Sequence, residues 1–229
     1  MNPSRIALAV GLLFGIGVSA CSDDNPTDPG SSTDAPNAGT SYTLRGVTTD
    51  ELGRIIQSRD IISVIVETNQ SYFGRTGLVK MVTAGSPGYL QYGANGDIAT
   101  VYYVSMNGVL VDSSWISYPF GSKSSSALPA VNQNLSGFVV TSQGEITYVG
   151  TESVTVPAGT FETQKVRIAT RMAMGSPDGE LMRNERIDTV FYSSAVRYFV
   201  KQSGIQHQIF GDDTTTFYNV GTLSSYSLK

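Results

Sequence analysis

The sequence predicts an all-β protein: a single antiparallel barrel, an open half-barrel or a sandwich of about ten or more strands, with at most one short helix. Three observations support this fold class. Charged residues make up only 15% of the 229-residue chain, which contains 24 Gly and 12 Tyr, a composition that favours strands and turns. Runs of β-branched residues recur along the chain, and clusters of turn residues separate them. Between two such runs, Asn107-Gly108 is a strong signal for a two-residue hairpin turn.

The first twenty residues have the pattern of a bacterial signal peptide. Arg5 precedes an uncharged apolar stretch at 6–18, which is too short for a stable transmembrane anchor but suits the apolar region of a signal. Small residues then lead to the single cysteine, in Val18-Ser19-Ala20-Cys21. This segment resembles the bacterial lipobox, usually Leu-Ser/Ala-Gly/Ala-Cys, with Val18 in place of Leu.

The lipobox resemblance implies cleavage between Ala20 and Cys21. It also implies a diacylglyceryl group on the Cys21 thiol and a further acyl chain, such as palmitate, on its amino group. Several chains together anchor a protein stably in a membrane. By analogy with enterobacterial sorting, Ser22 after the cysteine implies the outer membrane. The alternative is ordinary secretion with a free thiol at Cys21, because Val-Ser-Ala also satisfies the small-x-small cleavage rule.

Residues 22–40 predict a disordered tether, because they are almost all polar, Gly or Pro and cannot offset the entropy of ordering. The tether carries four Asp and no basic residue; without these and Arg5, 14 basic and 15 acidic residues remain in 41–229. A domain this close to neutral has no strong electrostatic reason to bind nucleic acid or anionic lipid headgroups. The expected organisation is a signal peptide at 1–20, the lipidated Cys21 and tether at 21–40, and a β-rich domain at 41–229.

Strand patterns fill most of the β-rich domain. One segment is ambiguous: Thr48–Glu51 has capping-box spacing, so a short helix at 49–58 competes with an extended conformation. The expected strands are Ile61–Thr68, Tyr72–Thr83, Tyr89–Tyr92, Ile98–Ser105, Val109–Tyr118, Gly137–Thr141, Glu145–Val156, Thr160–Arg171, Leu181–Ser193, Ala195–Gln202, Gln206–Phe210 and Thr214–Leu228. The expected turns include Asn69–Ser71, Ser86–Gly88, Asn95–Asp97, Pro157–Gly159 and Ser176–Gly179, and 122–133 is expected to be a loop.

The segment Val154–Phe161 reads Val-Thr-Val-Pro-Ala-Gly-Thr-Phe. In a hairpin, Pro157 would fix φ at the end of a strand and Gly159 would supply a positive φ. Pro157, Ala158 and Gly159 are therefore expected to form a structural turn, with Val154, Val156 and Phe161 packed on one sheet face.

The same segment resembles a Val-x-Val-Pro-Ala-Gly-Thr-Phe motif of uncharacterised bacterial envelope proteins. Trp115–Pro119 and Val190–Lys201 are similar to two looser elements of those proteins, although Arg197 or Tyr198 stands where glycine is usual. The resemblance covers about residues 98–204. It implies a β-rich fold, distantly similar to the open-barrel lipoprotein carriers of the periplasm, and it implies no activity.

No catalytic residue, metal ligand or cofactor is predicted. The single histidine, His207, lies in an alternating strand, and no Gly-x-Ser-x-Gly elbow supplies a nucleophile, so a polar cross-strand role is expected. Asp212-Asp213 lacks the spacing of a calcium loop, which favours a solvated turn. A single cysteine excludes an internal disulfide and a Cys-based zinc site. An acid pair remains open for the carboxylates on expected strands, which are Glu67, Glu145, Glu152, Glu162 and Asp188.

The aromatic residues leave one hypothesis for binding. All of the 12 Tyr, nine Phe and one Trp except Phe14 lie in 41–229. A half-barrel lined by Tyr, Phe, Met and Val either holds a lipid or other apolar ligand or is simply packed. The expected function is that of a membrane-anchored lipoprotein of the cell envelope, whose non-enzymatic domain binds an apolar ligand or an envelope protein. The alternative is an envelope hydrolase with an acidic site that the sequence does not reveal.

Overall fold

The computed structural model describes residues 35–106, 109–135, 137–176 and 179–229. Within these ranges the chain forms 13 strands and no helix. The strands are β1 (Ser41–Asp50), β2 (Ile55–Tyr72), β3 (Arg75–Thr83), β4 (Ser86–Tyr92), β5 (Ile98–Met106), β6 (Val109–Tyr118), β7 (Ser125–Ala127), β8 (Val131–Leu135), β9 (Phe138–Val156), β10 (Gly159–Ser176), β11 (Gly179–Ser193), β12 (Tyr198–Phe210) and β13 (Asp213–Ser227). The expected all-β fold is confirmed.

All strands belong to one antiparallel sheet with the order β6-β5-β4-β3-β2-β1-β13-β12-β11-β10-β9-β7, and β8 also pairs with β9. Most neighbours are consecutive in the chain, so the sheet is largely a meander. The exception that shapes the molecule is the pairing of the first strand with the last, β1 with β13. Of the three expected architectures, the chain adopts the open one, because β6 and β7 end the sheet without pairing to each other.

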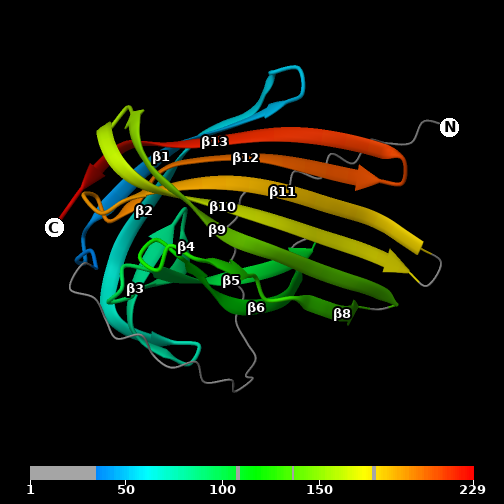
Figure 1. Ribbon diagram of the computed structural model, residues 1–229, viewed down its shortest axis with the longest axis horizontal. Coiled ribbons are helices and arrows are strands. Elements are labelled where there is room, and N and C mark those ends of the chain that lie inside the picture. The colour runs from blue at the N-terminus through cyan, green and yellow to red at the C-terminus, as the bar shows by residue number, and fades with distance from the viewer. Residues whose placement is uncertain (1–34, 107–108, 136, 177–178) are drawn as a thin grey trace.

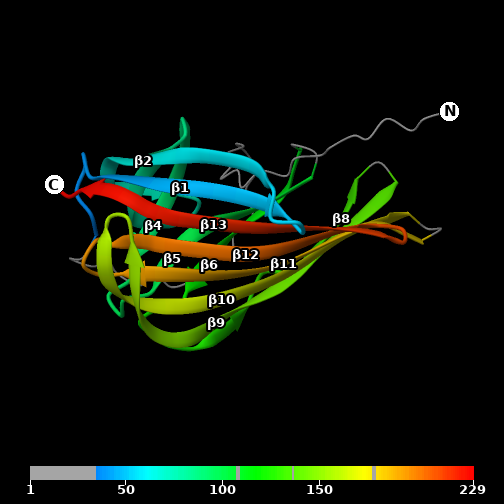
Figure 2. The same cartoon turned by 90° about the horizontal axis from the view of Figure 1, so that it is seen from above.

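The sheet is strongly curved, so that the short strands β3–β6 lie beneath the long strands β9–β13 (Figures 1 and 2). The core fills the space between these two limbs. It combines side chains such as Leu90 and Ile116 from the short strands with Val166 and Val190 from the long strands. At the bend, β1 and β13 contribute Tyr42 and Leu223, both with no exposed surface.

The short helix considered at 49–58 does not form, and the extended conformation is found instead. The carboxylate of Asp50 accepts hydrogen bonds from the backbone N–H groups of Leu52 (3.0 Å) and Arg54 (2.9 Å), which closes a tight turn between β1 and β2. Leu52 and Ile55, which would have formed the apolar helical face, are 76% and 66% exposed. A helix here would have had no core to pack against.

Several expected boundaries shift, for local reasons. Asn69–Ser71 is not a turn but an irregular part of β2, where Asn69 takes a φ of 56° and the register with β3 slips. The 122–133 segment, expected to be a loop, contains β7 and β8, which pair with β9. The strand expected from Ala195 begins at Tyr198, because residues before it form the turn from β11.

The described chain begins a few residues before β1. Thr40 is fully buried, and the backbone of Gly39 donates to the carbonyl of Ile65 (2.8 Å). The side chain of Asn37 donates to the carbonyl of Lys229 (2.8 Å), which ties this segment to the C-terminal end. None of the described residues forms a helix long and apolar enough to cross a membrane.

Candidate ligand-binding groove

The inner, concave face of the sheet is built from alternate residues of each strand, because successive side chains of a strand point to opposite faces. Cross-strand partners share a face, so the register assembles three parallel rows from β2, β1 and β13. Along β1 these rows contain Leu44, Gly46 and Thr48 in turn. Residues from all three rows line a groove of about 1320 Å³, part of which is open to solvent.

The first row is apolar. Leu44 pairs with Ile61 of β2 and with Leu223 of β13. Leu223 is fully buried, while Leu44 and Ile61 are half-buried and line the groove. Val190 and Phe199 extend this apolar surface from β11 and β12. This part of the groove favours contact with hydrocarbon, since burying apolar surface is the main driving force for binding it.

Glycines form the floor of the groove in the second row. Gly46 of β1 pairs directly with Gly221 of β13, and neither position requires a positive φ. A Cβ added at Gly221 would meet nothing within 4 Å, and one at Gly46 would make only ordinary van der Waals contact. The row continues to Arg59 of β2 and Gln202 of β12. The missing side chains therefore leave a depression between these two long polar residues.

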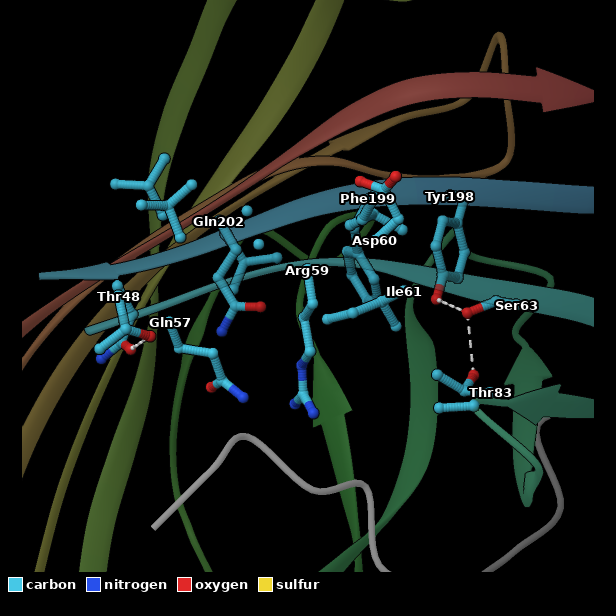
Figure 3. Close-up of a pocket in the computed structure, with 18 of the residues that line it drawn as sticks. Thr48, Gln57, Arg59, Asp60, Ile61, Ser63, Thr83, Tyr198, Phe199 and Gln202 are labelled. Carbon is cyan, nitrogen blue, oxygen red and sulfur yellow. Dashed lines mark hydrogen bonds between the residues drawn. The ribbon is translucent and has the colours of Figure 1, made fainter. Parts of the chain in front are cut away.

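The third row is polar and uncharged. Thr48 pairs with Gln57 on β2 and with Asn219 on β13. The hydroxyl of Thr48 donates to Oδ1 of Asn219 (2.8 Å), which orients that amide. Figure 3 shows Thr48, Gln57 and Arg59 toward one end of the groove and Ile61, Ser63 and Tyr198 toward the other. The groove thus changes from apolar to polar along its length.

Beyond the apolar row the inner face is filled with aromatic side chains. Tyr42 stacks on Tyr198 with ring centroids 4.1 Å apart. Phe120 is fully buried and stacks on Tyr192, with ring centroids 4.8 Å apart. The ring centroids of Tyr118 and Phe199 are 5.4 Å apart. The concave face is therefore packed with side chains at this end of the sheet, as one of the two expectations had it, and is not filled at the groove.

The buried tyrosines have polar partners. Tyr42 donates to the carbonyl of Val196 (3.0 Å) and Tyr92 to that of Arg197 (2.9 Å), both in the turn between β11 and β12. Tyr198 donates to Ser63 (3.3 Å), whose hydroxyl also contacts that of Thr83 (2.9 Å) at the apolar end of the groove (Figure 3).

Burial changes the ionisation of these tyrosines. It raises the pKa of Tyr42 and that of Tyr92, because a phenolate is poorly solvated in the core. It also raises the pKa of Tyr198, although the hydrogen bond to Ser63 opposes the shift. All three phenols therefore stay protonated and act as hydrogen-bond donors at neutral pH.

A second cavity of about 620 Å³, also partly open, lies between the turns that follow β4 and β11. Two of the polar side chains that line it hold neighbouring backbone segments in place. Asp97 accepts hydrogen bonds from the backbone of Gly121 and Ser122, both at 2.8 Å, and Arg197 donates to the carbonyl of Ala35 (3.3 Å). We take the groove with the glycine floor as the candidate site, because its lining combines an apolar part with a polar part.

Four of the five carboxylates considered for an acid pair lie in separate ion pairs. Glu67 contacts Lys80 (2.7 Å), Glu152 contacts Lys165 (2.8 Å), and both carboxylates are largely exposed. The hydrogen bond from Lys165 lowers the pKa of Glu152. The carboxylate of Glu145 lies 3.9 Å from the guanidinium of Arg167, near the limit for an ion pair. The side chain of Glu162 is exposed.

Asp188 is the buried member of the set of carboxylates. It is 7% exposed and receives two hydrogen bonds from Arg186, one of them at 2.9 Å. Because the guanidinium of Arg186 balances its negative charge, we assign Asp188 a structural role in this ion pair. Among the described residues no group of three or more His, Cys, Asp or Glu side chains is placed to hold a metal ion.

His207 lies on β12 directly opposite Thr216 of β13, and its Nδ1 is 3.1 Å from that hydroxyl. This is the polar cross-strand contact that the sequence predicts. Asp212 lies in the turn between β12 and β13, and Asp213 begins β13; both are exposed. Neither residue approaches the groove lining.

The Val154–Phe161 segment forms the expected hairpin. Pro157 and Ala158 make the turn between β9 and β10, Gly159 has a φ of 135°, and Val154, Val156 and Phe161 are all buried in the core. The backbone of Ala158 donates to the carbonyl of Leu223 (3.1 Å), so the turn is fastened to β13. Its role is structural, since these residues do not line the groove.

Arg197 and Tyr198 are the two residues compared with the usual glycine of the envelope-protein element, and their backbone conformations differ. Arg197 has a φ of 57°, in the left-handed region that glycine adopts most readily, whereas Tyr198 begins β12. The residues predicted for cleavage and lipidation, Ala20 and Cys21, lie outside the described residues. The groove residues Gly46, Arg59 and Gly221 were not singled out from the sequence, although a glycine within a strand signals a close approach or an open space.

No protein-family model matches this chain, and a search of curated proteins finds no match. Three solved structures are similar in outline. A candidate lipoprotein from Parabacteroides distasonis is 15% identical, with a TM-score of 0.46 over 86% of this chain and 100% of that chain. A candidate exported protein with a YmcC-like fold from Bacteroides fragilis is 14% identical, with a TM-score of 0.42 over 84% of this chain and 97% of that one.

The third structure is the hypothetical lipoprotein YmcC from Escherichia coli, which is 10% identical, with a TM-score of 0.31 over 87% of this chain and 93% of that one. At these TM-scores the likeness is too weak to support a conclusion about function.

Proposed function

We propose that this protein is a lipid-anchored lipoprotein of the bacterial cell envelope, at the outer membrane, whose β-domain binds an apolar ligand without catalysis. The observation that carries the binding proposal is the glycine floor. Gly46 and Gly221 lie side by side beneath a groove whose walls include Leu44, Ile61 and Phe199. The part of β1 after Leu44 thus leaves a space open. Elsewhere on the same face of the sheet, aromatic side chains fill the corresponding space.

The absence of catalysis is part of this proposal. Support comes from the groove lining, where the only acidic residue is Asp60. The carboxylate of Asp60 lies 3.1 Å from the guanidinium of Arg45, the residue directly across from it on β1. Both residues belong to the outer face of the sheet. The acidic site considered from the sequence is a pair of carboxyl groups about 5–10 Å apart across a cleft, as in glycoside hydrolysis, and this groove lining provides no second carboxyl group.

The binding proposal is tested with the mature chain Cys21–Lys229, carrying Cys21→Ser to keep it free of lipid, and the neutral fluorescent probe N-phenylnaphthylamine. Gly221→Leu places a side chain in the open space of the groove. We expect it to weaken probe binding at least about tenfold, because it occupies the volume that the probe would enter. Thr222→Leu is the matched control, since it places the same leucine side chain at the neighbouring residue, which points to the opposite face of the sheet.

Circular dichroism and urea unfolding show whether both variants keep the native fold. Equal probe affinity in the native chain and in a folded Gly221→Leu variant would refute binding in the groove. A native chain that binds no apolar probe would refute apolar ligand binding as a whole.

The anchor has its own test, the intact mass of membrane-extracted protein beside a Cys21→Ser variant. We expect the native mass to match Cys21–Lys229 plus a diacylglyceryl group and an acyl chain, and the variant to be unprocessed or released. A native protein without lipid would leave a freely secreted β-domain. The lipid anchor and the binding of an apolar ligand are therefore tested independently of each other.

One observation favours the second candidate function, contact with an envelope protein. On the outer face, Ile187, Ile205 and Tyr218 are direct cross-strand neighbours on β11, β12 and β13. They are 40–42% exposed and form a continuous apolar stripe. Ile205→Lys would abolish such a contact and leave probe binding in the groove unchanged, as measured by co-purification of crosslinked envelope proteins beside the probe titration.

A further inference from the structure

Two glycines leave the backbone at the floor of the groove open. Gly46 of β1 pairs directly with Gly221 of β13, and both are half-buried, so their peptide groups remain accessible. A Cβ at Gly221 would meet nothing within 4 Å. A glycine inside a strand weakens the sheet and often marks a place where a ligand approaches the backbone closely. The pair therefore indicates a surface on which a ligand lies directly against peptide groups.

A third glycine on the same face shows what a covered position looks like. Gly204 of β12 pairs with Asn219 of β13, and a Cβ at Gly204 would overlap the carboxylate of Asp188. The side chain of Asp188 thus occupies the space above Gly204. No described residue does the same above Gly221, so this part of the floor is left for a ligand.

The open floor is flat and limited in extent. Across the strands it is bordered by Arg59 on β2 and Gln202 on β12, about 14 Å apart at the usual spacing of strands. Along β1 it is bordered by Leu44 and Thr48, about 13 Å apart. A planar ring gains contact over its whole face here, because no Cβ holds it away from the peptide groups. A puckered ring of the same size makes fewer contacts.

A hydrogen-bond donor lies at one end of this floor and apolar side chains lie at the other. The hydroxyl of Thr48 donates to Oδ1 of Asn219 (2.8 Å), so the nitrogen of that amide is the end left to donate to a ligand. Figure 3 shows Thr48 toward this end of the groove and Ile61 and Phe199 toward the other. A neutral amide nitrogen suits an uncharged acceptor such as a carbonyl oxygen. The floor, the donor and the apolar row together describe three parts of one ligand.

We propose that the ligand of this groove is a planar ring with carbonyl oxygens and a hydrocarbon tail, which is the chemistry of a lipid-soluble quinone. The ring lies on Gly46 and Gly221, and one carbonyl oxygen accepts a hydrogen bond from the amide of Asn219. The tail follows the apolar row through Leu44 and Ile61. This inference rests on the proposed apolar binding function and specifies its ligand class.

The test is equilibrium dialysis of the mature Cys21→Ser chain against three ligands with the same tail, namely 2-hexyl-1,4-benzoquinone, 2-hexylcyclohexane-1,4-dione and hexylbenzene. The dione carries the same two carbonyl groups on a puckered ring. Each affinity is divided by the partition coefficient of the ligand into octanol, which removes the difference in hydrophobicity. We expect the quinone to bind about tenfold more tightly than the dione on this scale, because only the planar ring lies flat on the floor. Cys21→Ser also removes the single thiol, with which a quinone would react.

Gly221→Ala raises a methyl group from the floor into open space, so it leaves the fold intact. We expect the affinities for the quinone and for hexylbenzene to fall about tenfold, because the methyl group lifts a planar ring off the peptide groups. The affinity for the dione should fall less than about threefold. Ser203→Thr is the matched control, because it adds one methyl group on the opposite face, beside Val220.

Asn219→Leu keeps the approximate size of the side chain and removes the amide donor. We expect the affinity for the quinone to fall about fivefold to tenfold, because its carbonyl loses a hydrogen bond, and the affinity for hexylbenzene to stay unchanged. Circular dichroism shows whether the variant keeps the native fold. An unchanged affinity for the quinone in a folded variant would overturn the placement of the carbonyl at Asn219.

The comparison of quinone and dione needs no variant beyond Cys21→Ser. Equal corrected affinities for the two would overturn the planar ring and leave the proposed function intact. Failure of all three ligands to bind a chain that still binds N-phenylnaphthylamine would likewise overturn the quinone assignment alone. A chain that binds neither these ligands nor the probe would refute apolar ligand binding itself.

Discussion

The inner face of the sheet has a packed half and a hollow half, and the same strands run through both. On β1 the inward positions pass from Tyr42, stacked at 4.1 Å on Tyr198, to Gly46 on the floor of the groove. On β13 they pass from buried Leu223 to Gly221, where a Cβ would meet nothing within 4 Å. The order of the strands is the same in both halves, and the register of β1 with β13 shifts by one residue between Thr43 and Leu44.

This comparison shows that side-chain volume, and not strand arrangement, decides whether an open half-barrel is filled. In the packed half, large rings from both limbs of the sheet meet, as Phe120 does with Tyr192. In the hollow half, two glycines lie next to each other and the long side chains beside them are polar. A curved sheet creates the concavity, and the inward residues determine how much of it remains.

Alkaline pH is expected to have the largest effect, and it acts on the packed half. Tyrosines in the unfolded chain ionise near pH 10, whereas burial raises the pKa of Tyr42, Tyr92 and Tyr198 in the folded protein. Above pH 10 the unfolded state therefore binds fewer protons, and stability that is complete below pH 10 is lost as pH rises. Each tyrosine lowers the free energy of unfolding by up to about 1.4 kcal/mol per pH unit.

Urea unfolding between pH 8 and 11, followed together with tyrosinate absorbance, measures this effect of pH. A free energy of unfolding that stays constant across pH 10 would contradict the burial of these phenols. Tyr42→Phe, which retains the ring and removes the ionisable group, is expected to reduce the slope above pH 10.

Tyr42→Ala would break the packed half. The substitution removes the stacking on Tyr198 and the hydrogen bond to Val196, and it leaves a cavity where no surface was exposed. We expect a loss of about 3–5 kcal/mol in the free energy of unfolding, as for other large aromatic residues in cores. A loss below about 1 kcal/mol in urea unfolding would mean that the stacking of Tyr42 on Tyr198 contributes little to the stability of the fold.

Two glycines on neighbouring strands sharpen the comparison. A Cβ at Gly204 would lie 2.1 Å from Oδ1 of Asp188 and 3.3 Å from the carbonyl of Ile187, so Gly204→Ala must displace a buried ion pair. We expect it to cost about 1–3 kcal/mol. Gly221→Ala, with open space around the new methyl group, should be neutral or slightly stabilising. Thermal unfolding of the two variants side by side tests the difference, and equal melting temperatures would contradict it.

The smallest effect is expected on the outer face. Arg45 and Asp60 form an ion pair at 3.1 Å with both side chains more than half exposed. Arg45→Met should change the free energy of unfolding by less than about 1 kcal/mol, because water and salt screen such pairs. A larger loss would show that the outer face contributes to holding β1 on β2.

The fold class and much of the strand pattern could be predicted because they depend on local signals. Alternating β-branched runs identified β5, β6, β11 and β13 closely, and the Pro157–Gly159 turn was located with the burial of its flanking valines. Errors arose where local signals conflict. The residues at 49–58 carry a helix-capping pattern, yet the Asp50 carboxylate caps a tight turn instead, since no core lies where a helical face would need one.

The sequence by itself determined that the described chain would be an open or closed all-β structure without a recognisable catalytic motif, and it predicts the lipid anchor at Cys21. Only the tertiary structure decided that there is a groove and where it lies. Gly46 and Gly221 come from opposite ends of the chain and meet because β1 pairs with β13. Whether two small inward-facing residues lie side by side depends on the register between strands that are distant in sequence. The periodicity within a single strand does not determine that register.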